Sequence, residues 1–347
     1  MPQELRKWMS ARGENKRTIS KQAFSKARQH LKPEAFIELV RLQRDTTFQT
    51  TEALETKNGY VVFAIDGSTL EVERTEETEQ YFGMWSKTNA CRARASVLVE
   101  LSIGMIAQAR IAPLSEDERS LAREHLKEFK PYAPEKTLVI YDRGYASKEI
   151  IQELNEMGYS YLFRLQESFS ARITAMDLGD HRHKIPYKRS VLNVRIIKLT
   201  LPNGTVETLL TNLTTEAFRY EEFMALYFMR WGIETRYKSL KSTIEIEGFS
   251  GRSVVAIQQD FYASIYIANM LMLLKAASDI EIEAENADKG LKNEYQTNEK
   301  MGVSILKDKL IYILLDDNPR KRARRFTALV NEMKQYRSEV RLARECA

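Results

Sequence analysis

Short apolar runs alternate with amphipathic stretches between residues 60 and 165, and this pattern predicts a mixed α/β domain. Five of the runs are rich in β-branched and aromatic residues, as strands are: YVVFAID (60–66), ASVLVELS (95–102), GMIAQARI (104–111), KTLVIYD (136–142) and YSYLFRL (159–165). Two stretches, 115–129 and 147–158, carry apolar residues at the spacing of a helix. The predicted order is therefore βββαβαβ, with a turn at Gly67-Ser68 after the first strand.

The segments on either side of this domain have other patterns. Residues 166–213 hold two alternating arms around a PNG turn, which predicts a β-rich insertion. Within it, the stretch DHRH (180–183) offers two histidines to a metal, but the further ligands of a closed site are missing, so a loop is favoured. Residues 3–44 are predicted to form two helices. The apolar stretch 253–277 predicts a buried helix, and the acidic stretch 278–292 predicts an exposed linker.

Composition and charge narrow the class of protein. With 43% hydrophobic and 29% charged residues over 347 positions, the chain is expected to fold as a soluble protein. Its two cysteines cannot build a disulfide framework, which fits a reducing cytoplasm, and the longest apolar run, 261–274, is too short to span a bilayer. Residues 1–45 hold eleven Lys and Arg against five Asp and Glu, and residues 319–347 hold nine against three. These basic ends predict arms that bind a polyanion, although solvated basic termini are also common.

Two of the predicted strands end on an acidic residue. Asp66 closes the first strand and Asp142 closes the fourth, so adjacent strands would bring both carboxylates to one edge of the sheet. Ligands of open α/β sheets gather outside the carboxyl ends of the strands. Either aspartate alone is equally well explained as the cap of a turn. Together they are candidates for a cation site.

The stretch YFMRWGIETRYKSLK (227–241) is predicted to be one helix that gathers charged groups on one face. At 100° per residue, one arc of this helix carries an aromatic side chain, a carboxylate and three cations: Tyr227, Glu234, Arg230, Lys238 and Lys241. A carboxylate that binds a cation, beside groups that hold phosphates, suits phosphodiester cleavage. The alternative is a solvated helix in which Glu234 and Lys238 form an ordinary i,i+4 pair. Gly232 is unusual inside a helix and suggests a close approach to the backbone.

These motifs together resemble a known family. The stretch AIDGSTL surrounds Asp66, IYDRGYAS surrounds Asp142, and the spacing Y-x2-R-x3-E-x6-K runs from Tyr227 to Lys241. They are similar to the DDE transposases of bacterial insertion sequences, and within these to the insertion-sequence-four family. The resemblance covers roughly residues 18–275, and the region ahead of Ser20 is short for the family.

The resemblance implies an RNase-H-like mixed β-sheet flanked by helices, with a β-rich insertion and helical N- and C-terminal segments. It implies that Asp66, Asp142 and Glu234 are the catalytic, metal-binding triad, and that Tyr227, Arg230 and Lys241 contact DNA phosphates. It further implies a homodimer that cuts terminal inverted repeats and joins them to target DNA. The expected parts are a helical DNA-binding segment (1–50), a catalytic core in two pieces (58–165 and 214–277), the insertion (166–213) and a basic helical region (278–347).

The chemistry of the residues fits this implication. Three carboxylates brought close together repel one another unless a cation lies among them, and oxygen ligands favour two Mg²⁺ ions, or Mn²⁺ as a substitute. Lys238, Arg143 and Tyr145 are further candidates for DNA contacts. We expect a cytoplasmic, nucleoid-associated protein with no membrane segment. The competing interpretations are a catalytically inactive or domesticated DNA-binding descendant, and a stand-alone nuclease that gives no strand-transfer products.

Overall fold

The computed structural model describes residues 9–10, 13, 19–50, 56–129, 133–287, 289 and 293–340. These residues form two compact units, each described by itself. The core unit comprises the described residues of 40–238, and the helical unit comprises those of 1–39 and 239–342. The helix α3 (Glu34–Thr50) runs across the boundary between them.

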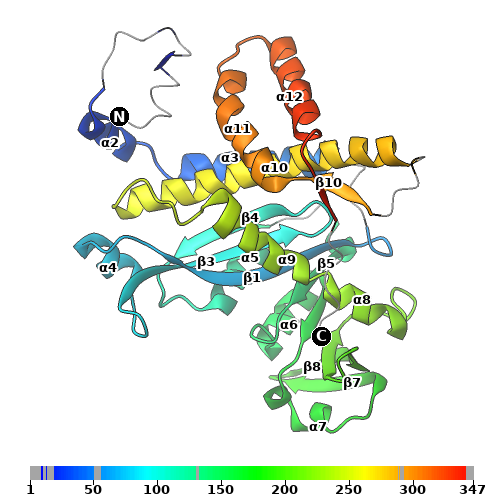
Figure 1. The fold of residues 1–347 in the computed structure, drawn as a ribbon. Coiled ribbons are helices and arrows are strands. Elements are labelled where there is room, and N and C mark those ends of the chain that lie inside the picture. The colour runs from blue at the N-terminus through cyan, green and yellow to red at the C-terminus, as the bar shows by residue number, and fades with distance from the viewer. Residues whose placement is uncertain are drawn as a thin grey trace. The chain divides into compact units, whose positions relative to one another are not determined.

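The core unit is built on one mixed β-sheet, which holds nine strands among the described residues (Figure 1). The strands are β1 (Val61–Glu71), β2 (Met84–Trp85), β3 (Ala90–Glu100), β4 (Met105–Ala112), β5 (Thr137–Tyr141), β6 (Ser160–Arg164), β7 (Gly179–Tyr187), β8 (Ser190–Thr200) and β9 (Val206–Thr211). β1 pairs antiparallel with β3 and parallel with β5, and β5 pairs parallel with β6. The order β4-β3-β1-β5-β6 is that of an RNase-H-like sheet, so the predicted fold class is confirmed.

The β-rich insertion extends the same sheet. β9 pairs antiparallel with β6, and β8 and β7 follow beyond it as a hairpin. The two histidines at 181 and 183 therefore lie in β7, and the expectation of a loop there is wrong. The reason is the long register with β8, in which His181 faces Ile196 and His183 faces Val194. His181 Nε2 lies 3.0 Å from the carbonyl oxygen of Asp177, a contact that holds the ring against its own chain.

The apolar side chains of the sheet alternate between its two faces, as the period of a strand requires. One face packs under α5 (Glu118–Glu128) and α6 (Lys148–Glu156), with Phe63, Val139 and Phe163 among its buried residues. The other face packs under α8 (Phe223–Phe228) and the loop before it, with Val62 and Leu138 among its buried residues. Because both faces of these strands are buried, functional groups are expected at the edges of the sheet.

Two short elements, α4 (Glu76–Phe82) and β2, were not predicted from the sequence, and a turn was predicted where β1 continues. β1 runs through Gly67 to Glu71, because its second half pairs with residues Ser96 to Arg92 of β3. Short elements of this kind have few periodic positions, so their pattern is weak. Because β1 continues beyond Asp66, this aspartate lies inside a strand and not at its end. Only β5, the parallel partner of β1, ends at the level of Asp66.

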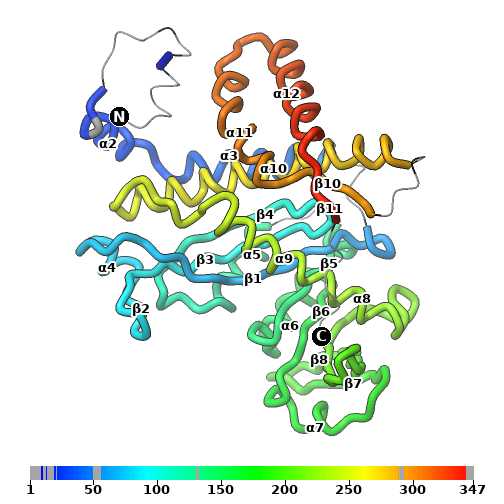
Figure 2. The backbone as a smooth tube through the Cα atoms, viewed as in Figure 1, coloured from blue at the N-terminus to red at the C-terminus, as the bar shows by residue number. Residues whose placement is uncertain are grey.

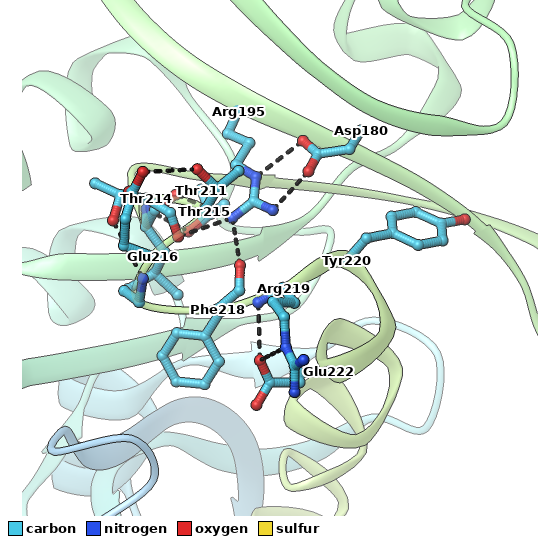
Figure 3. A network of polar contacts seen from close by, with 12 residues as sticks. Asp180, Arg195, Thr211, Thr214, Thr215, Glu216, Phe218, Arg219, Tyr220 and Glu222 are labelled. Carbon is cyan, nitrogen blue, oxygen red and sulfur yellow. Dashed lines mark hydrogen bonds and ion pairs between the residues drawn. The ribbon is translucent and has the colours of Figure 1, made fainter.

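A buried arginine ties the insertion to the chain that leaves it (Figure 3). Arg195 of β8 forms two bonds with Asp180 of β7, at 2.9 and 2.6 Å. It also donates to the carbonyl oxygens of Thr214 and Phe218, at 3.0 and 2.7 Å, and its guanidinium lies 4.9 Å from the ring centroid of Phe223. These contacts fix the loop that leads from β9 into α8. The insertion thus helps to hold the start of α8 in place.

The helical unit contains α2 (Lys21–Gln29), a π-helical turn (Leu240–Ile244), α10 (Val254–Asn286), α11 (Glu299–Leu314) and α12 (Pro319–Met333), with a small sheet of β10 (Tyr295–Thr297) and β11 (Arg337–Glu339) (Figure 2). Ser20 caps α2, which lies within the predicted helical region 3–44, and the part of that region before Ser20 lies mostly outside the described residues. Arg28 of α2 binds α10 through Asp260, at 2.6 Å, and through the carbonyl oxygen of Ala256. Gly302 allows α11 to approach closely, since a Cβ there would lie 2.9 Å from Leu271 and from Met333.

The predicted linker at 278–292 is largely helical, because α10 continues to Asn286. Three of its acidic residues form ion pairs. Asp279 pairs with Lys275 at 2.5 Å, and Glu281 and Glu285 pair with Lys334 at 2.7 and 2.8 Å. By length and composition α10 would suit a membrane span, which is weak evidence, and 50% of its most apolar window is buried inside the protein. A core helix of a folded protein passes the same test.

His125 gives the core unit a testable dependence on pH. Burial, aided by the charge of Arg110, lowers the pKa of His125 to about 3, and its Nε2 contacts Ser96 Oγ at 3.0 Å. In the unfolded chain His125 binds a proton near pH 6.5, whereas in the folded chain it stays neutral down to a much lower pH. The free energy of unfolding therefore decreases as the pH falls below 6.5. We expect the loss of stability to steepen from about 0.7 kcal/mol per pH unit at pH 6.5 to about 1.4 kcal/mol per pH unit near pH 5.

The measurement is denaturant unfolding from pH 7 to 5 for the wild-type protein and for His125→Gln. The variant is neutral in both states, so the difference in unfolding free energy between the two proteins should narrow as the pH falls. A difference that is constant over this range would contradict the assignment of a buried neutral histidine.

Candidate active site

The two aspartates predicted from the strand pattern lie side by side at one edge of the core unit's sheet. The parallel register of β1 and β5 pairs Phe63 with Val139 and Ala64 with Ile140. Two further residues along the same register, beyond the end of β5, place Asp66 opposite Asp142. Burial, and then the charges of Asp142 and Glu118, raise the pKa of Asp66 to about 6, against the opposing effects of the Gly67 amide and Arg230. The edge therefore gathers negative charge that calls for a positive partner.

Asp142 has a tyrosine hydroxyl and an arginine beside its carboxylate. The hydroxyl of Tyr227 lies 3.5 Å from Asp142 Oδ1, and Arg164 Nη1 of β6 lies 3.9 Å from the same oxygen. Arg164 is itself held by Glu207 of β9, to which its Nε donates at 2.6 Å. The neighbouring strand β6 and the helix α8 thus both reach this carboxylate.

Arg230 is the cation that meets the acidic groups. It is buried, and its Nη2 donates to Glu234 Oε1 at 2.5 Å. Its guanidinium lies 6.0 Å from the ring centroid of Tyr227. The negative charges of Asp142 and Glu234 favour its charged form, and its own charge lowers the pKa of Asp66. One guanidinium therefore forms an ion pair with Glu234, and its charge also influences Asp66 and Asp142.

The expectation of one continuous helix over residues 227–241 is wrong. The segment consists of the end of α8, a tight turn at Met229 and Arg230, α9 (Trp231–Ser239) and the π-helical turn. In the turn the backbone bonds shorten to a spacing of three residues, as in Arg230 N–H to the Tyr227 oxygen at 3.0 Å. A Cβ at Gly232 would make only an ordinary contact, at 3.6 Å from Leu101, so no close approach explains that glycine. Tyr227, Arg230 and Glu234 nevertheless meet, all within the core unit.

The two lysines of the expected face lie in different places. Lys238 is exposed in the last turn of α9. Lys241 belongs to the helical unit, where its Nζ lies 3.9 Å from Glu247 Oε1.

The two residues that follow Asp142 face different surroundings. Arg143 is exposed and, with Arg164, Phe169, Lys198 and Glu207, lines a cavity of about 850 Å³. Tyr145 is 2% exposed and points into the protein, so it is not a surface contact for DNA. Among the described side chains, its buried hydroxyl has no hydrogen-bond partner. Its pKa is raised by burial and then by the charges of Asp66, Glu118 and Asp142.

Two residues of this edge were missed by sequence reasoning. Tyr237 of α9 donates from its hydroxyl to the carbonyl oxygen of Asp66 at 3.0 Å, and it thereby fixes α9 against β1. Glu118, the first residue of α5, lies against Gly67: a Cβ on that glycine would be 3.3 Å from Glu118 Cδ. Acidic residues are favoured in the first turn of any helix because they interact with the helix dipole. No signal in the sequence therefore singles out Glu118.

Among the described residues, no three Asp, Glu, His or Cys side chains are arranged as a ready metal site. The donor chemistry nevertheless suits a hard divalent cation, because the edge offers the carboxylate oxygens of Asp66 and Asp142. The arrangement lacks the third carboxylate, since Glu234 is bound to Arg230. Asp66, Asp142 and a released Glu234 would therefore be the residues to hold such an ion.

Comparison with known proteins decides the family. Residues 57–270, well over half of the chain, match the family described as "Transposase DDE domain". The chain belongs to the DDE transposase domain family. The match spans Asp66, Asp142 and Glu234, so all three acids lie within this DDE domain. Among curated proteins, no sequence matches the chain significantly.

One solved structure also resembles this chain. It is the piggyBac transposase, in a structure titled as a synaptic complex with hairpin DNA, with a TM-score of 0.43 and 9% sequence identity. The alignment covers 78% of this chain and 57% of the piggyBac chain, so the present chain spans little more than half the length of that protein. The fold assignment depends on the strand order described above.

Proposed function

We propose that this DDE transposase cuts and joins the ends of a bacterial insertion sequence by divalent-cation-dependent phosphoryl transfer. The observation that carries the proposal is the pair of aspartates on adjacent parallel strands, with Arg230 linking them electrostatically to Glu234. The family match supports the same function. An inactive DNA-binding descendant is not favoured, because all three acids of the DDE domain are present within the matched region.

The finer parts of the proposal follow the motif spacing. The spacing from Tyr227 to Lys241 favours the insertion-sequence-four family, whose substrates would be terminal inverted repeats and target DNA. A homodimer on DNA and a place at the nucleoid in the cytoplasm belong to the same proposal. Its partner is double-stranded DNA, which the exposed arginines and lysines would bind through phosphates.

The chain's own residues divide the work of the reaction. Asp66 and Asp142 would hold Mg²⁺, or Mn²⁺ in its place, and Glu234 must leave Arg230 to join them. When bound, two such ions activate the attacking oxygen and stabilise the leaving oxygen. Arg230, once released, has a planar fork that suits two oxygens of one phosphate, and Tyr227 beside it orients that fork.

Glu234 is the first residue to test. Glu234→Gln keeps the shape of the side chain but removes the charge that would bind the cation, so cleavage of DNA ends in Mg²⁺ or Mn²⁺ should fall by more than about 100-fold. Binding of end DNA should be unchanged or stronger, since one negative charge near the phosphates is gone. Asp66→Asn and Asp142→Asn should behave in the same way.

The matched control for Glu234→Gln is Glu247→Gln. The side chain of Glu247 is 39% exposed and contacts Lys241, while that of Glu234 is 41% exposed and contacts Arg230. The control should cleave within about threefold of wild type, because an exposed pair contributes little. Full cleavage by Glu234→Gln would remove the third member of the triad.

Arg230 should act through the geometry of its hydrogen bonds. Arg230→Lys keeps the charge but loses the planar fork, so end cleavage should fall roughly tenfold to a hundredfold, the value of one strong hydrogen bond to a charged group. Arg219→Lys, at an exposed arginine that pairs with Glu222 at 3.8 Å, is the control and should cleave normally. Normal cleavage by both variants at limiting protein would refute bidentate phosphate binding by Arg230.

The start of α12 should supply sequence-independent affinity for DNA. Arg320, Lys321, Arg322 and Arg324 are exposed on its first turns, whereas Leu329 and Met333 pack into the helical unit. Replacing the four cations with Gln should weaken binding of end and random DNA alike. It should also reduce the slope of log K against log salt by about 0.9 for each phosphate that the variant no longer neutralises.

Lys309→Gln is the control for α12, because Lys309 is exposed on α11 but forms an ion pair with Glu332. Its salt slope should match that of the wild-type protein. A salt slope that stays the same in the fourfold variant would show that α12 is only a solvated helix.

A further inference from the structure

The row of strands that carries the two aspartates continues with an arginine. The parallel register of β5 and β6 pairs Tyr141 with Phe163. One further step along this register places Arg164 opposite Asp142, in the same way that Asp142 stands opposite Asp66. Residues paired across adjacent strands point to the same face of a sheet. Three adjacent strands therefore present two carboxylates and one guanidinium side by side.

The face in question is the one that α8 covers. Leu138 precedes Asp142 by four residues and Leu162 precedes Arg164 by two, and both leucines are buried in the cluster that contains Tyr227. Because residues at even spacing in a strand share a face, Asp142 and Arg164 lie on the same side of the sheet as Tyr227. The distances agree, since Arg164 Nη1 and the Tyr227 hydroxyl lie 3.9 and 3.5 Å from Asp142 Oδ1.

The insertion holds Arg164 in this row. Glu207 of β9 is 5% exposed and accepts from Arg164 Nε at 2.6 Å and also from Nη2. Two bonds to one buried carboxylate fix the plane of the guanidinium. They leave the Nη1 amino group, which is close to Asp142 but forms no hydrogen bond with any residue that the structure describes. Glu207 is thus a positioning residue that presents Nη1.

The free Nη1 group is within reach of a ligand from solution. The Arg164 side chain is 21% exposed, and with the exposed Arg143 it lines the cavity of about 850 Å³. A divalent cation bound by Asp66 and Asp142 would lie next to this positive charge. An anion that contacts both offsets their repulsion. A phosphate of DNA is such an anion.

We propose that Arg164 binds, through Nη1, a phosphate of the cleaved DNA strand that neighbours the scissile one. This inference rests on the proposed function, since it requires DNA at the cation site. Arg164 is one strand, about 4.8 Å, further along the row than Asp142, so it meets the neighbouring phosphate and not the one that the cation holds. The simpler alternative is a buried ion pair with Glu207 that only stabilises the sheet, and it predicts no contact with a particular phosphate.

The test removes the arginine and the phosphate separately and together. A duplex of the element's end carries one neutral methylphosphonate, placed at each phosphate around the cut in turn, and cleavage is measured at limiting protein. For the wild-type protein, one position beside the scissile phosphate should lower cleavage roughly tenfold to a hundredfold, the value of a strong hydrogen bond to a charged group. In Arg164→Gln/Glu207→Gln, which leaves no unpaired buried charge, the same methylphosphonate should change cleavage by less than about twofold, because its partner is gone.

The matched control is Arg123→Gln/Glu153→Gln, a second ion pair of the core unit. Arg123 of α5 is 23% exposed and its Nε pairs with Glu153 of α6 at 3.1 Å, and both helices pack on the other face of the sheet. This control should show the full methylphosphonate effect of the wild-type protein. Equal methylphosphonate effects in the Arg164 variant and in wild type, or no effect in wild type, would overturn the inference.

The same assay separates this inference from the proposed function. If the wild-type protein does not cleave the unmodified end in Mg²⁺ or Mn²⁺, the proposed function is wrong and the role of Arg164 falls with it. If it cleaves the end and the Arg164 variant remains sensitive to the methylphosphonate, the proposed function stands and only the role of Arg164 is refuted.

A second measurement uses the wild-type protein and so does not depend on the folding of a variant. Phenylglyoxal adds to free guanidinium groups, and mass spectrometry of the digested protein locates the modified arginines. End DNA should protect Arg164, and end DNA with the methylphosphonate should protect it less, whereas Arg123 should react equally in every case. Modification of Arg164 that is the same with and without end DNA would overturn the inference.

Discussion

The mutual repulsion of Asp66 and Asp142 is the constraint on which the active site depends. Parallel pairing of β1 and β5 brings the two carboxylates to the same level, and burial raises the pKa of Asp66 to about 6. In the absence of a cation, the buried guanidinium of Arg230 offsets this charge and binds Glu234. The protein therefore carries an internal counter-ion, and the ion pair of Arg230 and Glu234 competes with the assembly of a three-carboxylate site.

The surrounding structure holds this arrangement from several directions. Tyr237 joins α9 to the backbone of Asp66, and the first turn of α5 joins both aspartate-bearing segments. Arg195 reaches from the insertion to the carbonyl oxygens ahead of α8, the helix that carries Tyr227. Because the insertion continues the sheet that contains β1 and β5, its hairpin and the two aspartate-bearing segments belong to one sheet. A change in the insertion can thus alter the geometry of Tyr227 and Arg230 without touching DNA.

Sequence reasoning reached the parts of the site that leave a local pattern. Asp66 and Asp142 follow apolar strands, and Glu234 lies at a characteristic spacing from Tyr227 and Arg230, so the sequence names all three as candidates. The sheet and its insertion could be predicted for the same reason, since their apolar residues alternate. β1 was expected to stop at a glycine, yet it continues because β3 pairs with its second half. That pairing is long-range and leaves no local signal.

The other features that were not predicted from the sequence also depend on long-range contacts. The tight turn at Met229 and Arg230 interrupts a sequence with good helical propensity, and the acidic end of α10 is helical because distant basic residues, Lys334 and Arg337, pair with it. Glu118 resembled any acid at the start of a helix until the fold brought Gly67 against it. Tertiary contacts decide these features, and a single sequence does not show them.

The most direct test of the central claim is a crystal structure of the chain with DNA ends and Mn²⁺, in which anomalous scattering locates the metal. We predict an anomalous peak shared by the carboxylates of Asp66 and Asp142, with Glu234 released from Arg230 and turned toward the peak. Anomalous peaks away from both aspartates, with Glu234 still bound to Arg230 in the DNA complex, would contradict the account.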